Sequence, residues 1–233
     1  MKRRSSYPLL RAVLPSWIMT LILFLPLLQG RIPLNIDWLA AHHYPWKTLT
    51  SPMVHNPDID DPVMEFYPLA ARAARVLGSG RIPLWNPDIG CGVPHLADFI
   101  SQPLDPLFLA GVFLTPSPAV AWALLLLLQQ LVLALAVAGL LLARRVSDLG
   151  AGISAAAVVF SAPLVNWMEL RRLNASMICM FLAFWAIERY RAHPRKLVVF
   201  AGAALGYGAL AGHPQFTLYA WILASAYFFY RTI

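Results

Sequence analysis

The chain has 233 residues, of which 59% are hydrophobic and only 12% are charged, and its formal net charge is +7. Soluble domains carry about 25% charged residues, so the surplus of apolar residues excludes an ordinary soluble fold and predicts an integral membrane protein. The basic residues lie in short clusters between apolar stretches, as they do in cytoplasmic loops of membrane proteins. This distribution argues against a nucleic-acid-binding protein.

The first apolar stretch covers residues 12–28 and follows a basic N-terminus that contains Lys2, Arg3 and Arg4. No small-residue cleavage site comes after it, which favours an uncleaved anchor helix over a secretory signal peptide. We therefore expect residues 1–30 to form a cytoplasmic N-terminus and the first transmembrane helix.

The second predicted part, residues 31–117, is a large loop outside the cytoplasm. It holds eight of the eleven acidic residues and is dense in proline and aromatic residues, a mixture too apolar for disorder. Residues 68–77 have a helical apolar stripe followed by Gly-Ser-Gly, which predicts a short helix at the membrane interface. Residues 106–114 form a second short apolar piece that is too brief to span a bilayer.

The third predicted part, residues 118–233, contains five further apolar stretches, at residues 119–143, 151–168, 175–187, 197–211 and 215–230. Together with the first stretch they predict an all-α bundle of about six transmembrane helices. A cytoplasmic N-terminus places most of the basic residues inside, as the positive-inside rule requires. Arg171 and Arg172 fall outside in this topology, either because they bind an anionic ligand or because the middle pair of spans is misassigned.

An ordered series of motifs in residues 56–98 resembles the bacterial YfhO-type family of membrane proteins. The family pattern is an acid, a glutamine or similar residue, Phe-Tyr-Pro, a helix, Gly-x-x-Pro-Leu-Trp-Asn-Pro, Gly-x-Pro, and Leu-Ala-Asn or Leu-Ala-Asp. The matching positions here are Asp61, Glu65 and residues 66–68, 80–87, 92–94 and 96–98. The later Gly-His-Pro-Gln sequence at residues 212–215 is similar to a further element of the family.

The resemblance implies a GT-C-type glycosyltransferase architecture, in which helical spans carry a large external loop with short interfacial helices. Such enzymes transfer a sugar from a polyprenyl-phosphate carrier to an acceptor outside the cytoplasm, here a cell-envelope polymer. The implied location is the bacterial cytoplasmic membrane. Two departures stand out: Glu65 occupies a position that is more often glutamine, and family members are several hundred residues longer, so this chain resembles only their N-terminal portion.

In these enzymes an acidic residue of the first external loop accepts the proton of the acceptor hydroxyl, a role that general base catalysis requires. Asp61 is the predicted base, with Asp60 beside it and Asp37 as the second choice. Two adjacent carboxylates would also favour a divalent cation, although no cysteine or histidine spacing predicts a metal site. The alternative for Asp60 and Asp61 is a solvated acidic turn.

The predicted substrate-binding residues share an external position and a polar or aromatic side chain. They are Glu65, Tyr67, Arg72, Arg81, Trp85, Asn86, Asp98, Arg171, Arg172, His213 and Gln215. Arginines would bind the phosphate of the lipid-linked donor, and aromatic rings would stack on the sugar. The alternative roles are snorkelling of arginines into headgroups and anchoring of aromatic rings at the interface.

Two other functional classes stay open. A non-catalytic membrane subunit, or a truncated fragment of such an enzyme, is compatible with the short chain. A lipid or solute transporter is less favoured, because transporters place ionisable residues at the middle of their spans and the predicted spans have no Asp, Glu, Lys or Arg there.

Overall fold

The computed structural model describes residues 7–49, 52–98 and 100–233, so Lys2, Arg3 and Arg4 lie outside the described residues. The described residues are mostly helical, which confirms the predicted all-α class. Within the described ranges, strand structure is limited to one antiparallel pair, β1 (Trp85–Asn86) and β2 (Val93–Pro94). The chain divides into two compact units.

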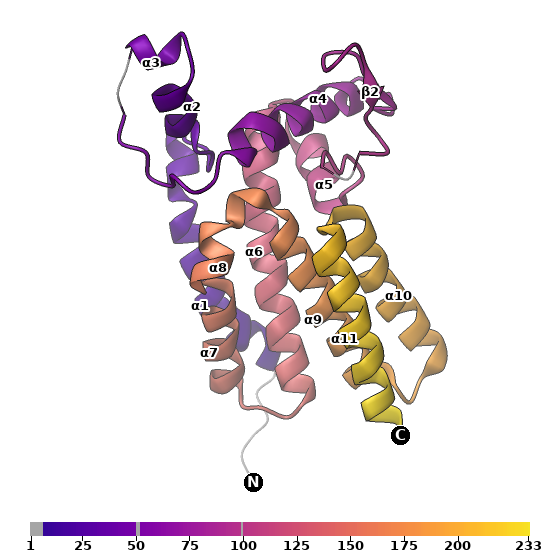
Figure 1. Ribbon diagram of the computed structural model, residues 1–233. Helices are drawn as coiled ribbons and strands as arrows, with labels where there is room; N and C mark the ends of the chain where they lie inside the picture. The colour runs from indigo at the N-terminus through magenta and orange to yellow at the C-terminus, as the bar shows by residue number, and fades with distance from the viewer. Residues whose placement is uncertain (1–6, 50–51, 99) are drawn as a thin grey trace. The chain divides into compact units, whose positions relative to one another are not determined.

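The first unit comprises Met1–Leu25, Leu127–Val165 and Arg171–Ile233. Its helices are α1 (Pro8–Leu23), the larger, C-terminal part of α6 (Pro118–Ala143), α7 (Asp148–Val159), α9 (Arg172–Tyr190), α10 (Pro194–Ala211) and α11 (Pro214–Thr232). Helix α1 lies alongside α7, and α9 packs against α10 and α11 (Figure 1). Several of these helices begin with proline, which is tolerated there because the first N–H groups of a helix need no partner within it.

The second unit comprises Pro26–Leu126 and Asn166–Leu170. Its elements are α2 (Ile36–His42), α3 (Trp46–Leu49), the π-helical turn η2 (Pro62–Phe66), α4 (Tyr67–Gly78), the β1–β2 pair, α5 (Pro106–Leu114) and the 3₁₀ turn η3 (Met168–Leu170). The 3₁₀ turn η1 (Leu25–Gln29) and the short helix α8 (Ala162–Asn166) fall at the boundaries of the two units. The helix predicted at residues 68–77 is confirmed as α4, and the short apolar piece at residues 106–114 forms the helix α5.

Two segments among the described residues are long and apolar enough to cross a bilayer, Pro8–Gln29 with 22 residues and α6 with 26. Only these two segments of the described residues have the length and apolarity of a span, so the prediction of about six spans is not met by this criterion. The predicted span at residues 151–168 divides into α7, which has 12 residues, and the separate α8, because Pro163 cannot continue the hydrogen-bond ladder of α7. A roughly 30 Å hydrocarbon core needs about 20 residues of helix. Helices α9, α10 and α11 carry charged or polar residues at their ends that lower their mean hydropathy.

Small residues set the spacing between helices of the first unit. A Cβ atom on Gly152 of α7 would lie 2.9 Å from the carbonyl oxygen of Ala12 in α1, and Gly208 of α10 faces the sulfur of Cys179 in α9. Glycines and alanines allow helix backbones to approach closely in membrane proteins. The small-residue character of the predicted 151–168 stretch thus serves the packing of α7 on α1.

Substituting Gly152 with alanine should destabilise the protein, because the new methyl group would push α7 away from the α1 backbone. Such overpacking costs about 1–3 kcal/mol, which thermal unfolding of the purified protein would detect. Gly202→Ala is the matched control, since a Cβ on Gly202 meets nothing within 4 Å. Equal melting temperatures for the two variants would contradict the close contact of α1 and α7.

Candidate functional site

The carboxylate of Asp37, in the first turn of α2, accepts hydrogen bonds from two separate segments of the second unit. Its Oδ1 accepts from the Trp38 N–H at 3.1 Å. Its Oδ2 accepts from the His55 backbone N–H at 2.8 Å and lies 2.9 Å from the His55 Nδ1 atom. Burial acts to raise the pKa of Asp37, but the hydrogen bonds from His55 and Trp38 outweigh burial and hold that pKa below its ordinary value. Asp37 is therefore a carboxylate at neutral pH.

The bond between Asp37 and His55 also orients the imidazole. A proton on Nδ1 directed at the carboxylate leaves Nε2 as an acceptor. The His55 side chain is 80% exposed, whereas that of Asp37 is only 20% exposed. The pair thus consists of a shielded carboxylate and an accessible ring, which is the arrangement in which a carboxylate positions a histidine base.

Asp37 and His55 line an open pocket of about 300 Å³ together with Asn35, Asn56 and Glu169. Oε2 of Glu169 accepts from the Asn35 N–H at 3.0 Å, and the Asn35 side-chain amide donates to the Ile59 carbonyl. Burial raises the pKa of Glu169, the Asn35 N–H partly offsets that rise, and the Asp37 carboxylate adds to it. The pocket therefore holds two carboxyl groups whose pKa values are shifted in opposite directions, a feature common at functional sites.

Asp60 and Asp61 lie outside the residues that line this pocket. Asp61 precedes η2, is exposed and makes no side-chain cap to that turn. The exposed Asp60 accepts the Val63 and Met64 N–H groups through its backbone carbonyl. Both aspartates thus lie at a solvent-exposed helix start, where no other side chain among the described residues is seen to support a catalytic role. The role of Asp61 as base stays a prediction.

The motif residues that follow form a folded hairpin. Arg72 of α4 pairs with Asp88 and reaches the carbonyl of Trp85, while buried Asn86 accepts the Asp88 N–H at 3.0 Å. The indole of Trp85 covers Gly92, where a Cβ would come within 2.5 Å of the ring. Arg72, Trp85 and Asn86 are thus brought together, with contacts that account for the Trp-Asn-Pro and Gly-x-Pro motifs as structural elements.

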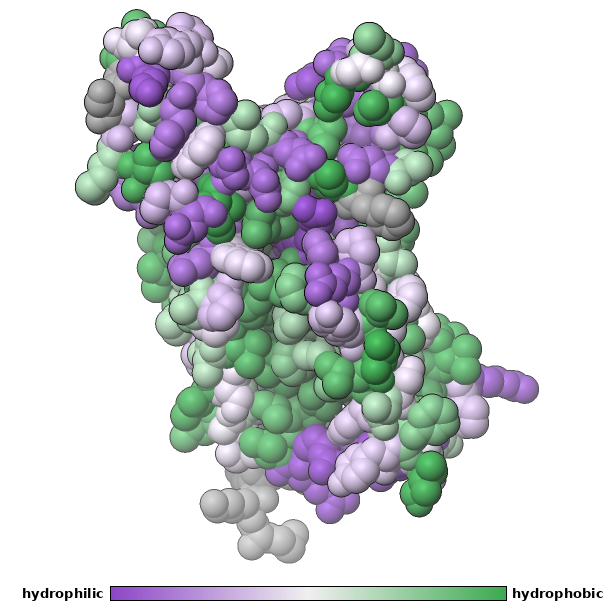
Figure 2. All heavy atoms as spheres, in the orientation of Figure 1, coloured by the Kyte–Doolittle hydropathy of each residue, from purple (hydrophilic) through white to green (hydrophobic). Residues whose placement is uncertain are grey.

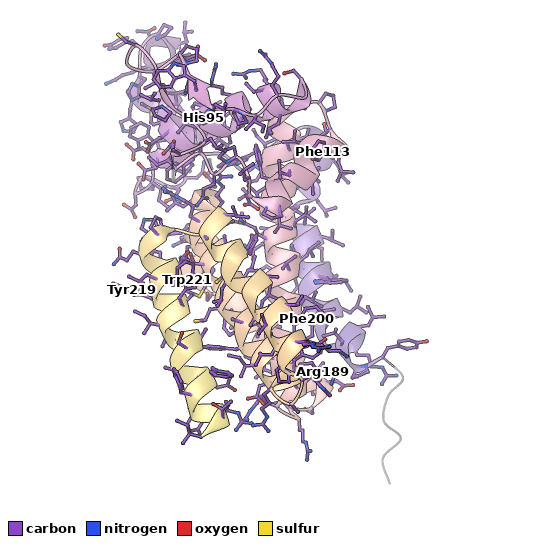
Figure 3. All side chains as sticks on the ribbon, turned by 90° about the vertical axis from the view of Figure 1, so that its right-hand side faces the viewer. His95, Phe113, Arg189, Phe200, Tyr219 and Trp221 are labelled. Atoms are coloured by element: carbon purple, nitrogen blue, oxygen red, sulfur yellow. The ribbon has the colours of Figure 1, made fainter. Side chains whose placement is uncertain are left out.

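The neighbouring segment closes this hairpin. Asp98 accepts the Ile100 N–H at 2.8 Å and the Ser101 N–H at 3.3 Å. His95, labelled in Figure 3, is buried, and this burial together with Arg72 lowers its pKa below the ordinary value. Asp98 therefore shapes a turn beside a buried histidine.

Three other predicted residues of the second unit lie apart from the pocket. The half-buried ring of Tyr67 packs edge-on against Trp122 with 5.8 Å between centroids, and burial raises the pKa of Tyr67. Glu65 is half-buried in η2, and the exposed Arg81 donates from Nε to the Ser79 hydroxyl at 3.2 Å. The Tyr67 ring thus contributes to packing, and its role in substrate binding stays a prediction.

The remaining predicted residues gather in the first unit, where α9 and α11 begin. The His213 N–H donates to the Arg172 carbonyl at 3.3 Å, and the Gln215 N–H donates to Nδ1 of His213 at 3.3 Å. Burial, followed by the charge of Arg172, lowers the pKa of His213. Arg171 is buried and has a positive φ of 46°. Arg172, His213 and Gln215 thus form one polar cluster at two adjacent helix N-termini.

Sequence reasoning missed four residues as parts of the pocket: Asn35, His55, Asn56 and Glu169. The one available signal was Glu169, an isolated acid between apolar stretches. No three His, Cys, Asp or Glu side chains of the described ranges are grouped to hold a metal ion.

The fold defines a protein of the all-α class, with two segments among the described residues long and apolar enough to cross a bilayer. Comparisons of the chain with models of known families, with curated proteins and with solved structures find no match. The resemblance to YfhO-type proteins therefore stays a prediction carried by the motifs of residues 56–98.

Replacing His55 with alanine should raise the pKa of Asp37, because the imidazole hydrogen bond and its favourable charge interaction are lost while the burial remains. A pH titration of the ¹³C-labelled carboxyl resonance of Asp37 would measure the shift. His42→Ala is the control, since the exposed His42 ring contacts the Trp38 carbonyl instead. An unchanged Asp37 titration in His55→Ala would contradict the pairing.

Proposed function

We propose that the chain is a multi-pass protein of a bacterial cytoplasmic membrane, with about six spans and a cytoplasmic N-terminus. Large apolar side chains on α10 and α11 support this topology, since Val198, Ile222 and Leu223 are all at least 50% exposed. Figure 2 displays apolar residues along the visible face of α11. Soluble monomers rarely leave contiguous apolar surfaces of this kind open to water. In this topology α7 and α8 together make one crossing.

The two native cysteines test the topology without any new label site. Cys91 is exposed in the proposed external loop, whereas Cys179 is buried in α9. A membrane-impermeant maleimide should therefore label intact spheroplasts at Cys91, and Cys91→Ser should abolish the labelling. Labelling that requires lysis would place the loop in the cytoplasm and refute the topology.

We further propose that the protein is a glycosyltransferase of the GT-C type, which transfers a sugar from a polyprenyl phosphate to a cell-envelope acceptor. The observation that carries this proposal is the Asp37–His55 pair in a pocket of the predicted external loop. The chemistry requires a base that removes the acceptor proton, and histidine held by a carboxylate is a common solution. The motif resemblance supplies the substrate class.

In the proposed reaction, Nε2 of His55 accepts the proton of the acceptor hydroxyl while Asp37 holds the ring. The acceptor oxygen forms a bond to the anomeric carbon of the donor, and the bond from that carbon to the phosphate oxygen breaks. The polyprenyl phosphate leaves with the electron pair of that bond. Asn35, Asn56 and Glu169 offer hydrogen bonds to sugar hydroxyls.

The donor phosphate needs cationic or N–H groups. Arg81 is an exposed cation of the second unit, the unit that also carries the Asp37–His55 pocket. We propose Arg81 as a phosphate-binding residue.

Asp37→Asn and His55→Ala should each lower the transfer rate by about 10²–10⁴-fold, the usual contribution of a positioned base. The double variant should be no slower than either single variant, because the two residues act as one unit. Incorporation of labelled sugar into the envelope fraction would measure the rates.

Asp61→Asn is the matched control, and it should retain transfer. A loss of transfer with Asp61→Asn alone would reassign the base to Asp61. Full transfer by all of these variants would leave a non-catalytic membrane subunit as the function.

A further inference from the structure

An apolar groove of about 320 Å³ lies among α9, α10 and α11 of the first unit. Its walls include Ile187 of α9, Leu197 and Leu205 of α10, and Phe228 of α11, and Ser225 is the only lining residue with a polar side chain. The groove is open along one side, where Val198 is 72% exposed. A surface of this composition excludes water and suits a hydrocarbon chain.

Basic residues gather at the end of the groove where α9 turns into α10. Arg195 and Lys196 directly precede the lining residues Leu197 and Val198, and both are exposed. Neither has an ion-pair partner among the residues that the structure describes. Figure 3 labels Arg189 and Phe200 at this same end. The ring of Tyr190 stacks on the ring of Phe200, with 4.7 Å between their centroids. The Arg189 guanidinium lies over the same Tyr190 ring.

The only nearby carboxylate of α9 is already neutralised. Glu188 accepts hydrogen bonds from Arg231 at 2.5 Å and from the Tyr227 hydroxyl at 2.7 Å, and Arg144 lies at 3.4 Å. Its charge is therefore not available to Arg195 and Lys196. This end of the unit is left with uncompensated positive charge next to an apolar groove.

We propose that this groove binds an anionic phospholipid, with one acyl chain against α9–α11 and the phosphate at Arg195 and Lys196. The charge complementarity selects an anionic headgroup, since basic residues at the end of a membrane helix attract anionic lipids, and Arg195 and Lys196 lie in the first turn of α10. The beginning of α10 adds to the attraction, because its N-terminal N–H groups favour an anion. The site is independent of the sugar chemistry and rests only on the membrane placement of α9–α11.

Native mass spectrometry of the full chain in detergent tests the site by titration with phosphatidylglycerol and with phosphatidylcholine of the same acyl chains. Phosphatidylglycerol should bind more tightly. Removal of each charge should weaken its binding by roughly fivefold. The double variant Arg195→Gln/Lys196→Gln should therefore lose about 25-fold, with phosphatidylcholine binding unchanged. Both residues are exposed, so the fold is not at risk.

Ala201→Phe tests the groove itself, because Ala201 lines it and the larger side chain would fill it. This variant should weaken the binding of both lipids, whereas Ala203→Phe, at an exposed position of α10 outside the lining, should bind as the parent does. Equal affinity for the two lipids, or unchanged binding by Ala201→Phe, would overturn the proposal. A dimer that dissociates in Ala201→Phe would also overturn it, by assigning the groove to a second copy.

Discussion

The constraint on which the rest of the structure depends is the need to cover apolar helix surface. In the first unit many buried positions hold alanine or glycine, which lets helix backbones approach closely, beside larger residues such as Leu133 and Ile178, while many other large apolar side chains are exposed. Soluble proteins place more of their large apolar side chains in the core. In the proposed membrane placement the surrounding lipid tails are as apolar as leucine, so packing between such helices would rely on close van der Waals contact instead of hydrophobic burial. The glycines at positions 152 and 208 follow from this requirement.

Many of the polar contacts lie at helix ends and in the second unit, although Gln129 and Gln130 are buried within α6. Polar groups collect where helices begin or end, as at Arg172 and His213 and at Glu188 with Arg231. In the second unit, polar side chains instead form hydrogen bonds between segments distant in the chain. Asp37 contacts His55, 18 residues away, and Asn35 contacts Glu169, 134 residues away. The pocket is thus built by long-range contacts in a loop-rich region, where functional residues are commonly found.

The sequence predicts those elements that are defined by residues close together in the chain. Helix α4 is predicted to within one residue at each end, because an apolar stripe and a glycine stop define it. Pro163 marks the break after Val159, but hydropathy alone does not reveal that break. The pairing of Asp37 with His55 and Glu169 could not be predicted, since no periodicity connects these positions. The motif favours Asp61 as the base, but local sequence cannot distinguish a catalytic aspartate from one in a solvated turn.

The contrast between Asp37 and Asp61 shows what a motif does and does not specify. Much of the Trp-Asn-Pro and Gly-x-Pro pattern is accounted for by one hairpin, in which Gly92 lies under Trp85 and Asn86 is buried. Such contacts are needed for folding whatever the function. A base has a different requirement: it must be held, accessible and paired with a group that fixes its orientation. In the described structure Asp37 and His55 meet that requirement together, through N–H donors that keep the carboxylate ionised and a ring that faces solvent. Physical support of this kind, more than the position of an acid within a motif, is the reason to place the chemistry at Asp37 and His55.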